Sequence, residues 1–166
     1  MRKIECLTWV FAFLLMVAAD AMAQKLPGQG ADACTLVAKA EIEKLFGVTL
    51  ADGRKDPSIQ TPGHQSACDF ARSGGVGQIR VLLRHDTTPL VAGPEKATGK
   101  GSASLRYVKG LGDTAYFMDA GDLGTVLNVY RGGHDLILVS AMFVGSAAKV
   151  SPPVEKLARL VVDRWK

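Results

Sequence analysis

The chain has 166 residues, with 20 lysines and arginines against 16 aspartates and glutamates, which gives a formal net charge of +4. Such a length suits one domain that buries a real core without needing a metal to hold it. The charges are spread along the chain without any block of five or more of one sign, and aromatic residues make up only 7%. A nucleic-acid-binding protein is therefore a poor candidate, because it needs concentrated basic charge and rings that stack on bases.

The N-terminus has the three parts of a cleavable export signal. Arg2 and Lys3 form a short cationic start, and residues 7–19 are apolar apart from one threonine. A run of this length is too short for a membrane-spanning helix, which needs roughly 20 apolar residues. A small-x-small pattern at residues 21–23 follows, so we predict a signal peptide of residues 1–23, cut between Ala23 and Gln24. The alternative is a buried N-terminal helix of the folded domain.

The predicted mature chain is expected to be periplasmic or secreted, without a membrane span. No apolar stretch after residue 23 approaches the length that a spanning helix needs. A lipid anchor requires a cysteine directly after the cleavage site, and Cys6 lies before the apolar run. The mature chain keeps about 143 residues, and its net charge is still +4 because the signal contains two basic and two acidic residues.

The mature chain contains two cysteines, Cys34 and Cys68. An even count in an exported protein favours a disulfide, and the alternatives are a free buried pair or a Cys/His metal site. Closing a loop of about 35 residues would stabilise the fold by roughly 4 kcal/mol in the chain-entropy model. Because no Cys-x-x-Cys pattern is present, a thiol oxidoreductase is improbable.

The N-terminal elements are predicted from caps and apolar spacing. Residues 24–31 are glycine-rich and are expected to form a flexible leader before a single domain of residues 32–166. Asp32 can cap a first short turn through Cys34 and Leu36. Lys39 to Phe46 then predicts a helix with one apolar face that ends at Gly47.

A β-hairpin is predicted in the middle of the chain. Residues 48–51 favour a short strand, and residues 52–65, with two glycines and two prolines, favour a loop. Ala67 to Arg72 and Gln78 to His85 flank a glycine-rich turn, and apolar and polar residues alternate in the second segment. The pattern predicts a hairpin with one buried face. Residues 86–105 have weak periodicity and are expected to form mainly a long loop.

The C-terminal half predicts a three-strand meander followed by a helix. The strands are expected at 114–118, 123–131 and 135–143, joined by polar or glycine-rich turns. Ser151 is expected to cap the helix and Pro152 to take its first position. Its apolar stripe consists of Val154, Leu157, Ala158, Val161 and Trp165. The element order predicts an α+β domain, with an antiparallel sheet packed by an N-terminal and a C-terminal helix.

Three stretches resemble a family of uncharacterised bacterial exported proteins, many of them lipoproteins. They are DACTLVAKAEI at residues 32–42, ACDF at 67–70 and KGLGDTAY at 109–116. The family pattern is an Asp-x-Cys-x-Leu-Leu-x-x-x-Glu-Val opening, a second cysteine strand and a Gly-Leu-Gly-Asp-x-Ala turn. This chain differs in lacking the lipidated cysteine and in having Ala38 where a capping Ser or Thr is usual. The resemblance implies a Cys34–Cys68 bridge and an α+β fold, and it supplies no catalytic residues.

No motif selects a catalytic, metal or cofactor site. Residues 93–101 (GPEKATGKG) have five residues between the glycines of a phosphate loop instead of four, and Gly101 where a Ser or Thr should stand. The Gly-x-Ser-x-Gly elbow of serine hydrolases is absent. Three histidines, His64, His85 and His134, lack metal-ligand spacing and are expected in exposed turns or strand ends. We therefore predict no catalytic residue, no metal site and no cofactor.

Four basic residues suggest a binding surface. Arg80 and Arg84 share the outward face of one predicted strand, and Arg106 and Lys109 precede another. If these segments are neighbours, they form a cationic strip for an anionic envelope component or an acidic protein partner. The alternative is an ordinary solvated sheet face.

The sequence thus favours an exported, non-enzymatic binding module stabilised by one disulfide. A small extracytoplasmic hydrolase or lyase with an unrecognised site is one alternative. A structural component of the cell envelope or of a secretion apparatus is the other.

Overall fold

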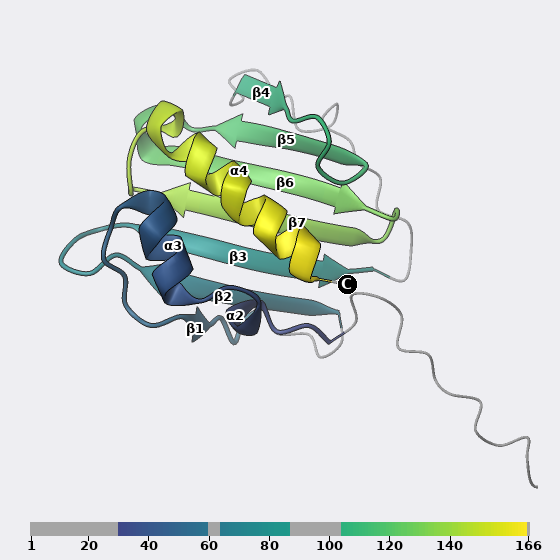
Figure 1. Ribbon diagram of the computed structural model, residues 1–166, viewed down its shortest axis with the longest axis horizontal. Coiled ribbons are helices and arrows are strands. Elements are labelled where there is room, and N and C mark those ends of the chain that lie inside the picture. The colour runs from purple at the N-terminus through teal and green to yellow at the C-terminus, as the bar shows by residue number, and fades with distance from the viewer. Residues whose placement is uncertain (1–29, 60–63, 87–103, 166) are drawn as a thin grey trace, which may run out of the picture.

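The structure, a computed structural model, describes residues 30–59, 64–86 and 104–165. Outside these ranges lie the predicted signal peptide of residues 1–23, its cleavage site at Ala23 and Gln24, most of the 24–31 leader and most of the 86–105 segment. The described residues form one antiparallel sheet of seven strands in the order β1-β2-β3-β7-β6-β5-β4. The helices α2, α3 and α4 all lie on the same side of this sheet (Figure 1). The predicted fold class, an α+β domain with an antiparallel sheet, is confirmed.

The N-terminal helices form where the caps predict them. Helix α2 spans Ala33–Leu36, and the Asp32 carboxylate accepts a hydrogen bond from the Cys34 amide at 3.0 Å. Helix α3 spans Lys39–Phe46 and ends at Gly47, whose φ of 65° is the left-handed conformation that glycine adopts without strain. The predicted short turn and the predicted helix are both confirmed.

The strands follow the predicted hairpin and meander, with additions at both edges of the sheet. Pairing of β3 with β7, in which Val81 faces Val139, joins the hairpin to the meander. A one-turn 3-10 helix, η2, occupies Gly121–Leu123 between β5 and β6. The strands are β1 Arg54–Lys55, β2 Gln65–Ala71, β3 Gln78–His85, β4 Ser104–Tyr107, β5 Thr114–Asp119, β6 Gly124–Arg131 and β7 Asp135–Met142.

At the sheet edges, one predicted strand is absent and two short strands were not predicted. Residues 48–51 form no strand, and only Leu50 makes an isolated bridge, to Arg72. The edge strands β1 and β4 instead lie in segments that were expected to be loops or were not assigned. Both are too short to show the alternation of apolar and polar residues that reveals a strand in sequence.

The C-terminal helix begins earlier than predicted. Helix α4 spans Ala147–Arg164 with Ser146 as its N-cap, so Ser151 and Pro152 lie inside it. The Ser151 hydroxyl donates to the Ala147 carbonyl at 2.7 Å instead of capping the helix. Pro152 and Pro153 remove two backbone donors, but the carbonyls that would have accepted are on exposed residues that water can reach. No helix in the described part of the chain is long and apolar enough to cross a membrane.

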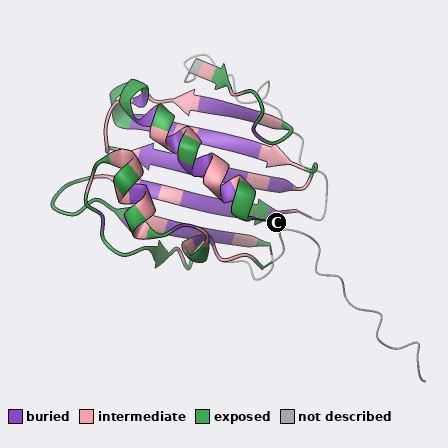
Figure 2. Ribbon diagram, in the orientation of Figure 1, coloured by how far each residue is buried: buried purple, intermediate pink, exposed green. Residues whose placement is uncertain are grey.

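The core lies between the sheet and the helices. The predicted stripe of α4 is confirmed, because Val154, Leu157, Ala158 and Val161 are fully buried and Trp165 is nearly so. The strands contribute every second residue, and Figure 2 shows the buried residues along their length. The sheet residues in the same core include Ile79, Val81, Leu83, Phe117, Leu127, Val129, Ile137 and Val139.

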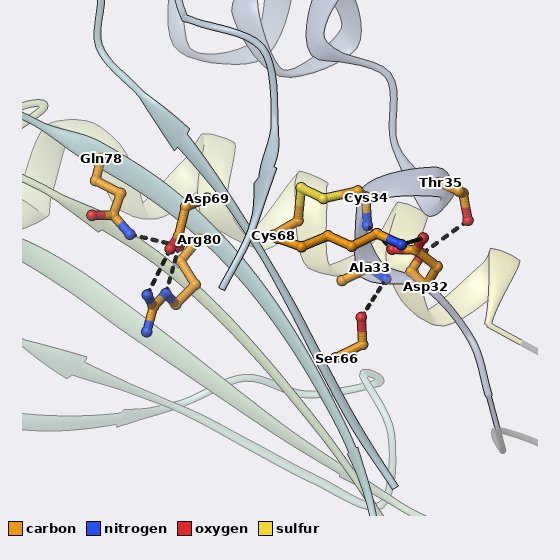
Figure 3. Close-up of a disulfide and its surroundings, with 10 residues drawn as sticks. Asp32, Ala33, Cys34, Thr35, Ser66, Cys68, Asp69, Gln78 and Arg80 are labelled. Carbon is orange, nitrogen blue, oxygen red and sulfur yellow. Dashed lines mark hydrogen bonds and ion pairs between the residues drawn. A yellow bond between two sulfur atoms is a disulfide. The ribbon is translucent and has the colours of Figure 1, made fainter. Parts of the chain in front are cut away.

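The disulfide fixes α2 to the sheet. Cys34 in α2 and Cys68 in β2 are bonded, with their Cα atoms 5.0 Å apart (Figure 3). The prediction of the pair is confirmed, and a free pair or a Cys/His metal site is excluded. Beside the bridge, the Ser66 hydroxyl accepts a hydrogen bond from the Ala33 amide at 3.0 Å. The first turn of the domain is thus attached to β2 by a covalent bond and a buried hydrogen bond.

Removing the bridge should destabilise the fold substantially. For Cys34→Ala with Cys68→Ala we expect a loss of about 4 kcal/mol in the free energy of unfolding, since the closed loop is long. Urea unfolding of the variant and of the reduced and oxidised wild type measures it. Equal denaturation midpoints for oxidised and reduced protein would contradict this account.

A salt bridge joins α3 to the end of α4. Arg164 makes a bidentate pair with Glu41, at 2.7 and 2.8 Å, and the same carboxylate accepts from the Ala38 amide. The hydrogen bonds from Arg164 are the main reason that the pKa of Glu41 is lowered from 4.5 to about 2. A lowered pKa in the folded state stabilises the fold above pH 4.5, and this contribution is lost as the pH falls towards 2.

We expect Arg164→Gln to raise the pKa of Glu41 from about 2 towards its ordinary value of 4.5. An NMR titration of the Glu41 side-chain carboxyl in both proteins measures this change. The pair is partly exposed, so its contribution to stability at neutral pH should be small. An unchanged Glu41 titration in the variant would show that Arg164 does not hold this carboxylate.

Candidate binding surface

The described helices cover only one face of the sheet, and no described helix covers the other, which we call the open face. Strand alternation and register place one set of residues from β4, β5, β6 and β7 on this open side. We call this set the uncharged half-face, because it contains no acidic or basic side chain. Its members are Leu105, Tyr107, Thr114, Tyr116, Met118, Val126, Asn128, Tyr130, Leu136, Leu138, Ser140 and Met142.

Three tyrosines from β4, β5 and β6 form a cluster within the uncharged half-face. The rings of Tyr116 and Tyr130 stack with centroids 6.1 Å apart, and Tyr107 lies 6.1 Å from Tyr116. Burial, reinforced by the hydrogen bond to Tyr130, raises the pKa of Tyr116 well above its usual value. Its phenol therefore stays neutral at physiological pH. Tyr107 is 60% exposed, so one edge of this cluster is available for contact.

The other half of the open face carries charges that are paired with each other. Arg80 donates from Nε to Asp69 at 2.6 Å and from Nη2 to Asp56 at 2.9 Å. Arg84 lies 2.7 Å from Asp86. The hydrogen bonds that Arg80 donates to Asp69 are the largest reason that the pKa of Arg80 is raised. The two arginines are consequently neutralised locally.

The four basic residues that suggested a cationic strip are not brought together. Arg80 and Arg84 are in β3, whereas Arg106 is in β4, with three strands between them and a separation of roughly 19 Å at about 4.8 Å per strand. Arg106 also lies on the helix side, with its guanidinium 4.1 Å from the centroid of the Phe117 ring. Lys109 follows β4 in an exposed turn. The condition for a continuous strip is not met.

A polar row at one end of the sheet was not expected. His85 Nδ1 lies 2.7 Å from Asp135, whose second oxygen accepts two hydrogen bonds from Arg131. Arg131 also donates to the carbonyls of Val162 and Trp165 and lies over the Trp165 ring, 4.9 Å from its centroid. Arg131 thus satisfies carbonyls at the C-terminal end of α4 that have no partner within the helix.

The three histidines gather at this end of the sheet. The expectation of exposed histidines was wrong for His85, which is only 7% exposed. Its amide donates to the His64 carbonyl, and its ring centroid lies 6.0 Å from that of His134. Among the described residues, no group of three His, Cys, Asp or Glu side chains could hold a metal ion.

A His–Asp pair occurs in catalytic triads, but a triad also needs a nucleophile that is hydrogen-bonded to the histidine. No hydroxyl or thiol among the described residues is hydrogen-bonded to His85, and the Ser66 hydroxyl is engaged by the Ala33 amide. The neighbouring hollow measures about 20 Å³, which is room for about one water. It is lined by Gly30, Ala31, His64, Gln65, Ser66, Leu83 and Trp165. The row is best explained as the support of the helix end.

Arg131→Met should therefore lower stability, because it leaves Asp135 and the helix carbonyls without their donor. We expect a loss of about 3 kcal/mol in the free energy of unfolding, as for other broken buried pairs. Lys39→Gln, which breaks a surface pair with Asp52, is the control and should have a much smaller effect. Chemical denaturation measures both. Equal effects of the two variants would contradict the structural role of Arg131.

No protein-family model, curated protein or solved structure matches the chain. The resemblance to exported bacterial proteins stays a prediction, and the function has to be argued from the geometry above.

Proposed function

We propose that the protein is an exported binding module that docks a protein partner on the uncharged half-face. The observation that supports this most is the absence of any charge over four adjacent strands on the side that the described helices leave open. At about 4.8 Å between strands and 3.4 Å per residue, these strands span roughly 400 Å². Tyr116, Asn128 and Ser140 are nearly buried within this area, so the surface open to a partner is smaller and consists mainly of the half-buried apolar side chains around them. Contiguous apolar patches of a few hundred Å² are often functional.

The composition of the half-face suits a protein surface. Tyr, Met and Leu predominate, and tyrosine and methionine are enriched in the buried centres of protein interfaces. Asn128 and Ser140 lie near the middle but are only 7% and 8% exposed, so the apolar and aromatic side chains around them supply most of the contact. A partner with apolar side chains fits best, because an unpaired charge buried against this surface would be costly.

The same surface argues against an anionic polymer as the ligand. Such a ligand needs basic side chains that are free to bind it. Arg80 already contacts two carboxylates and Arg84 contacts one, so binding an anion would break existing pairs. A standard interface buries about 800 Å² on each partner, so a patch of half that size favours a reversible complex.

The test places a photo-crosslinking amino acid at Leu138, in the half-face, and at Lys156, on the exposed side of α4, as the control. In envelope extract we expect one specific crosslinked product from position 138 and none from position 156. Excess wild-type protein should suppress the product, and excess Leu138→Glu should not. Leu138 is only half-buried, so Leu138→Glu should keep the wild-type melting temperature.

Several results would overturn this proposal. One is the same set of products from positions 138 and 156. Another is a product of twice the chain mass from purified protein, which would make the partner a second copy. A cysteine at position 138 that a thiol reagent cannot label in the monomer would show that the same chain covers the face.

A further inference from the structure

Three large hydrophobic side chains lie exposed at the end of the sheet where α4 begins. Val76 is 77% exposed in the β2–β3 turn, Leu123 is 50% exposed in η2, and Phe143 is 52% exposed just after β7. We call these three residues the hydrophobic tip. Figure 2 shows exposed turns at this end of the molecule, on the left of the view.

The tip is held together by its backbone. The Phe143 amide donates to the Leu123 carbonyl at 2.7 Å. The turn that carries Val76 approaches from the other side, so closely that a Cβ on Gly77 would lie 2.8 Å from the Phe143 carbonyl oxygen. Segments far apart in the sequence therefore bring these three residues to the same end of the sheet.

Phe143 is exposed at a cost to its backbone. Its φ is 58°, and no other non-glycine residue in the described part of the chain has a positive φ. For a bulky residue this conformation is a real outlier, and such strain is found where function requires it. Asparagine or glycine would fit the conformation better, so stability alone does not explain an exposed phenylalanine here.

Two exposed cations lie near the tip. Arg72 in the same hairpin turn and Lys149 in the first turn of α4 are exposed. Neither has an ion-pair partner among the described residues. The N-terminal end of α4 adds partial positive charge, and Asp122 is the acidic residue beside Leu123. Apolar side chains next to these two basic groups match a surface that is anionic outside and apolar beneath.

We propose that the hydrophobic tip inserts into the surface of a bilayer that contains anionic lipids. Phe143, Leu123 and Val76 enter the boundary between headgroups and acyl chains, and Arg72 and Lys149 contact the lipid phosphates. This contact is peripheral and reversible, since three side chains and two charges form a small anchor. The inference does not depend on the proposed partner, because the tip lies at the end of the strands and not on the half-face.

The experiment is co-sedimentation of the protein, as processed and purified after export, with vesicles of phosphatidylglycerol and phosphatidylcholine or of phosphatidylcholine alone. We expect binding to the anionic vesicles that weakens as salt is raised. The double variant Phe143→Asn with Leu123→Ser should bind at least tenfold more weakly. The control Lys156→Gln, which removes an exposed cation in the middle of α4 and outside the tip, should bind like the wild type.

The variants also distinguish the loss of a membrane contact from the loss of the folded structure. Phe143→Asn alone should keep or raise the melting temperature, because asparagine tolerates the left-handed conformation, and should still weaken vesicle binding. Arg72→Gln with Lys149→Gln should reduce binding to anionic vesicles only. The proposal is overturned if the wild type fails to sediment with anionic vesicles, if it sediments equally with neutral ones, or if the tip variants bind unchanged. Crosslinking from position 138 reports on the partner separately.

Discussion

The fold depends on how one long helix covers a sheet much wider than itself. Seven strands at about 4.8 Å span roughly 29 Å, whereas a helix with its side chains is about 10 Å across. Helix α4 lies over β6 and β7, and the β1–β3 side needs another cover. Helices α2 and α3 supply it, because the Cys34–Cys68 bond holds α2 on β2 and the Arg164–Glu41 pair holds α3 beside α4 (Figure 1). With all described helices on one side, the opposite face has no cover within the described chain.

The same helix accounts for the polar row that looks most like an active site. A helix that ends against a core leaves carbonyls without donors, and Arg131 supplies them. A guanidinium so placed requires a counter-ion, which Asp135 provides, and His85 satisfies the remaining carboxylate oxygen. Each member is thus required by the one before it. The His–Asp pair therefore has a structural explanation, and the surfaces of the sheet are the better candidates for a functional site.

Local signals in the sequence were enough for α3, β3, the meander and the disulfide. Gly47 ends α3, and alternation from Ile79 to Leu83 marks β3, because caps and side-chain period act over a few residues. The start of α4 was missed, since Ser151 and Pro152 mimic a helix start although helical turns precede them. The polar row depends on the pairing of β3 with β7, which no local pattern specifies. The uncharged half-face did leave a signal: β5, β6 and β7 are apolar at successive positions, which indicates two faces that avoid charge.

The two proposed surfaces are compatible in space because of where they lie on the sheet. The hydrophobic tip is at one end of the strands, and the uncharged half-face runs along their length on the side away from α4. If the tip contacts a bilayer, the strands stand away from the membrane and the half-face points sideways, parallel to the membrane plane. A partner bound there would sit next to the lipid surface without competing for the tip. The strained backbone of Phe143 and the exposure of its ring at the end of β7 then have one functional explanation.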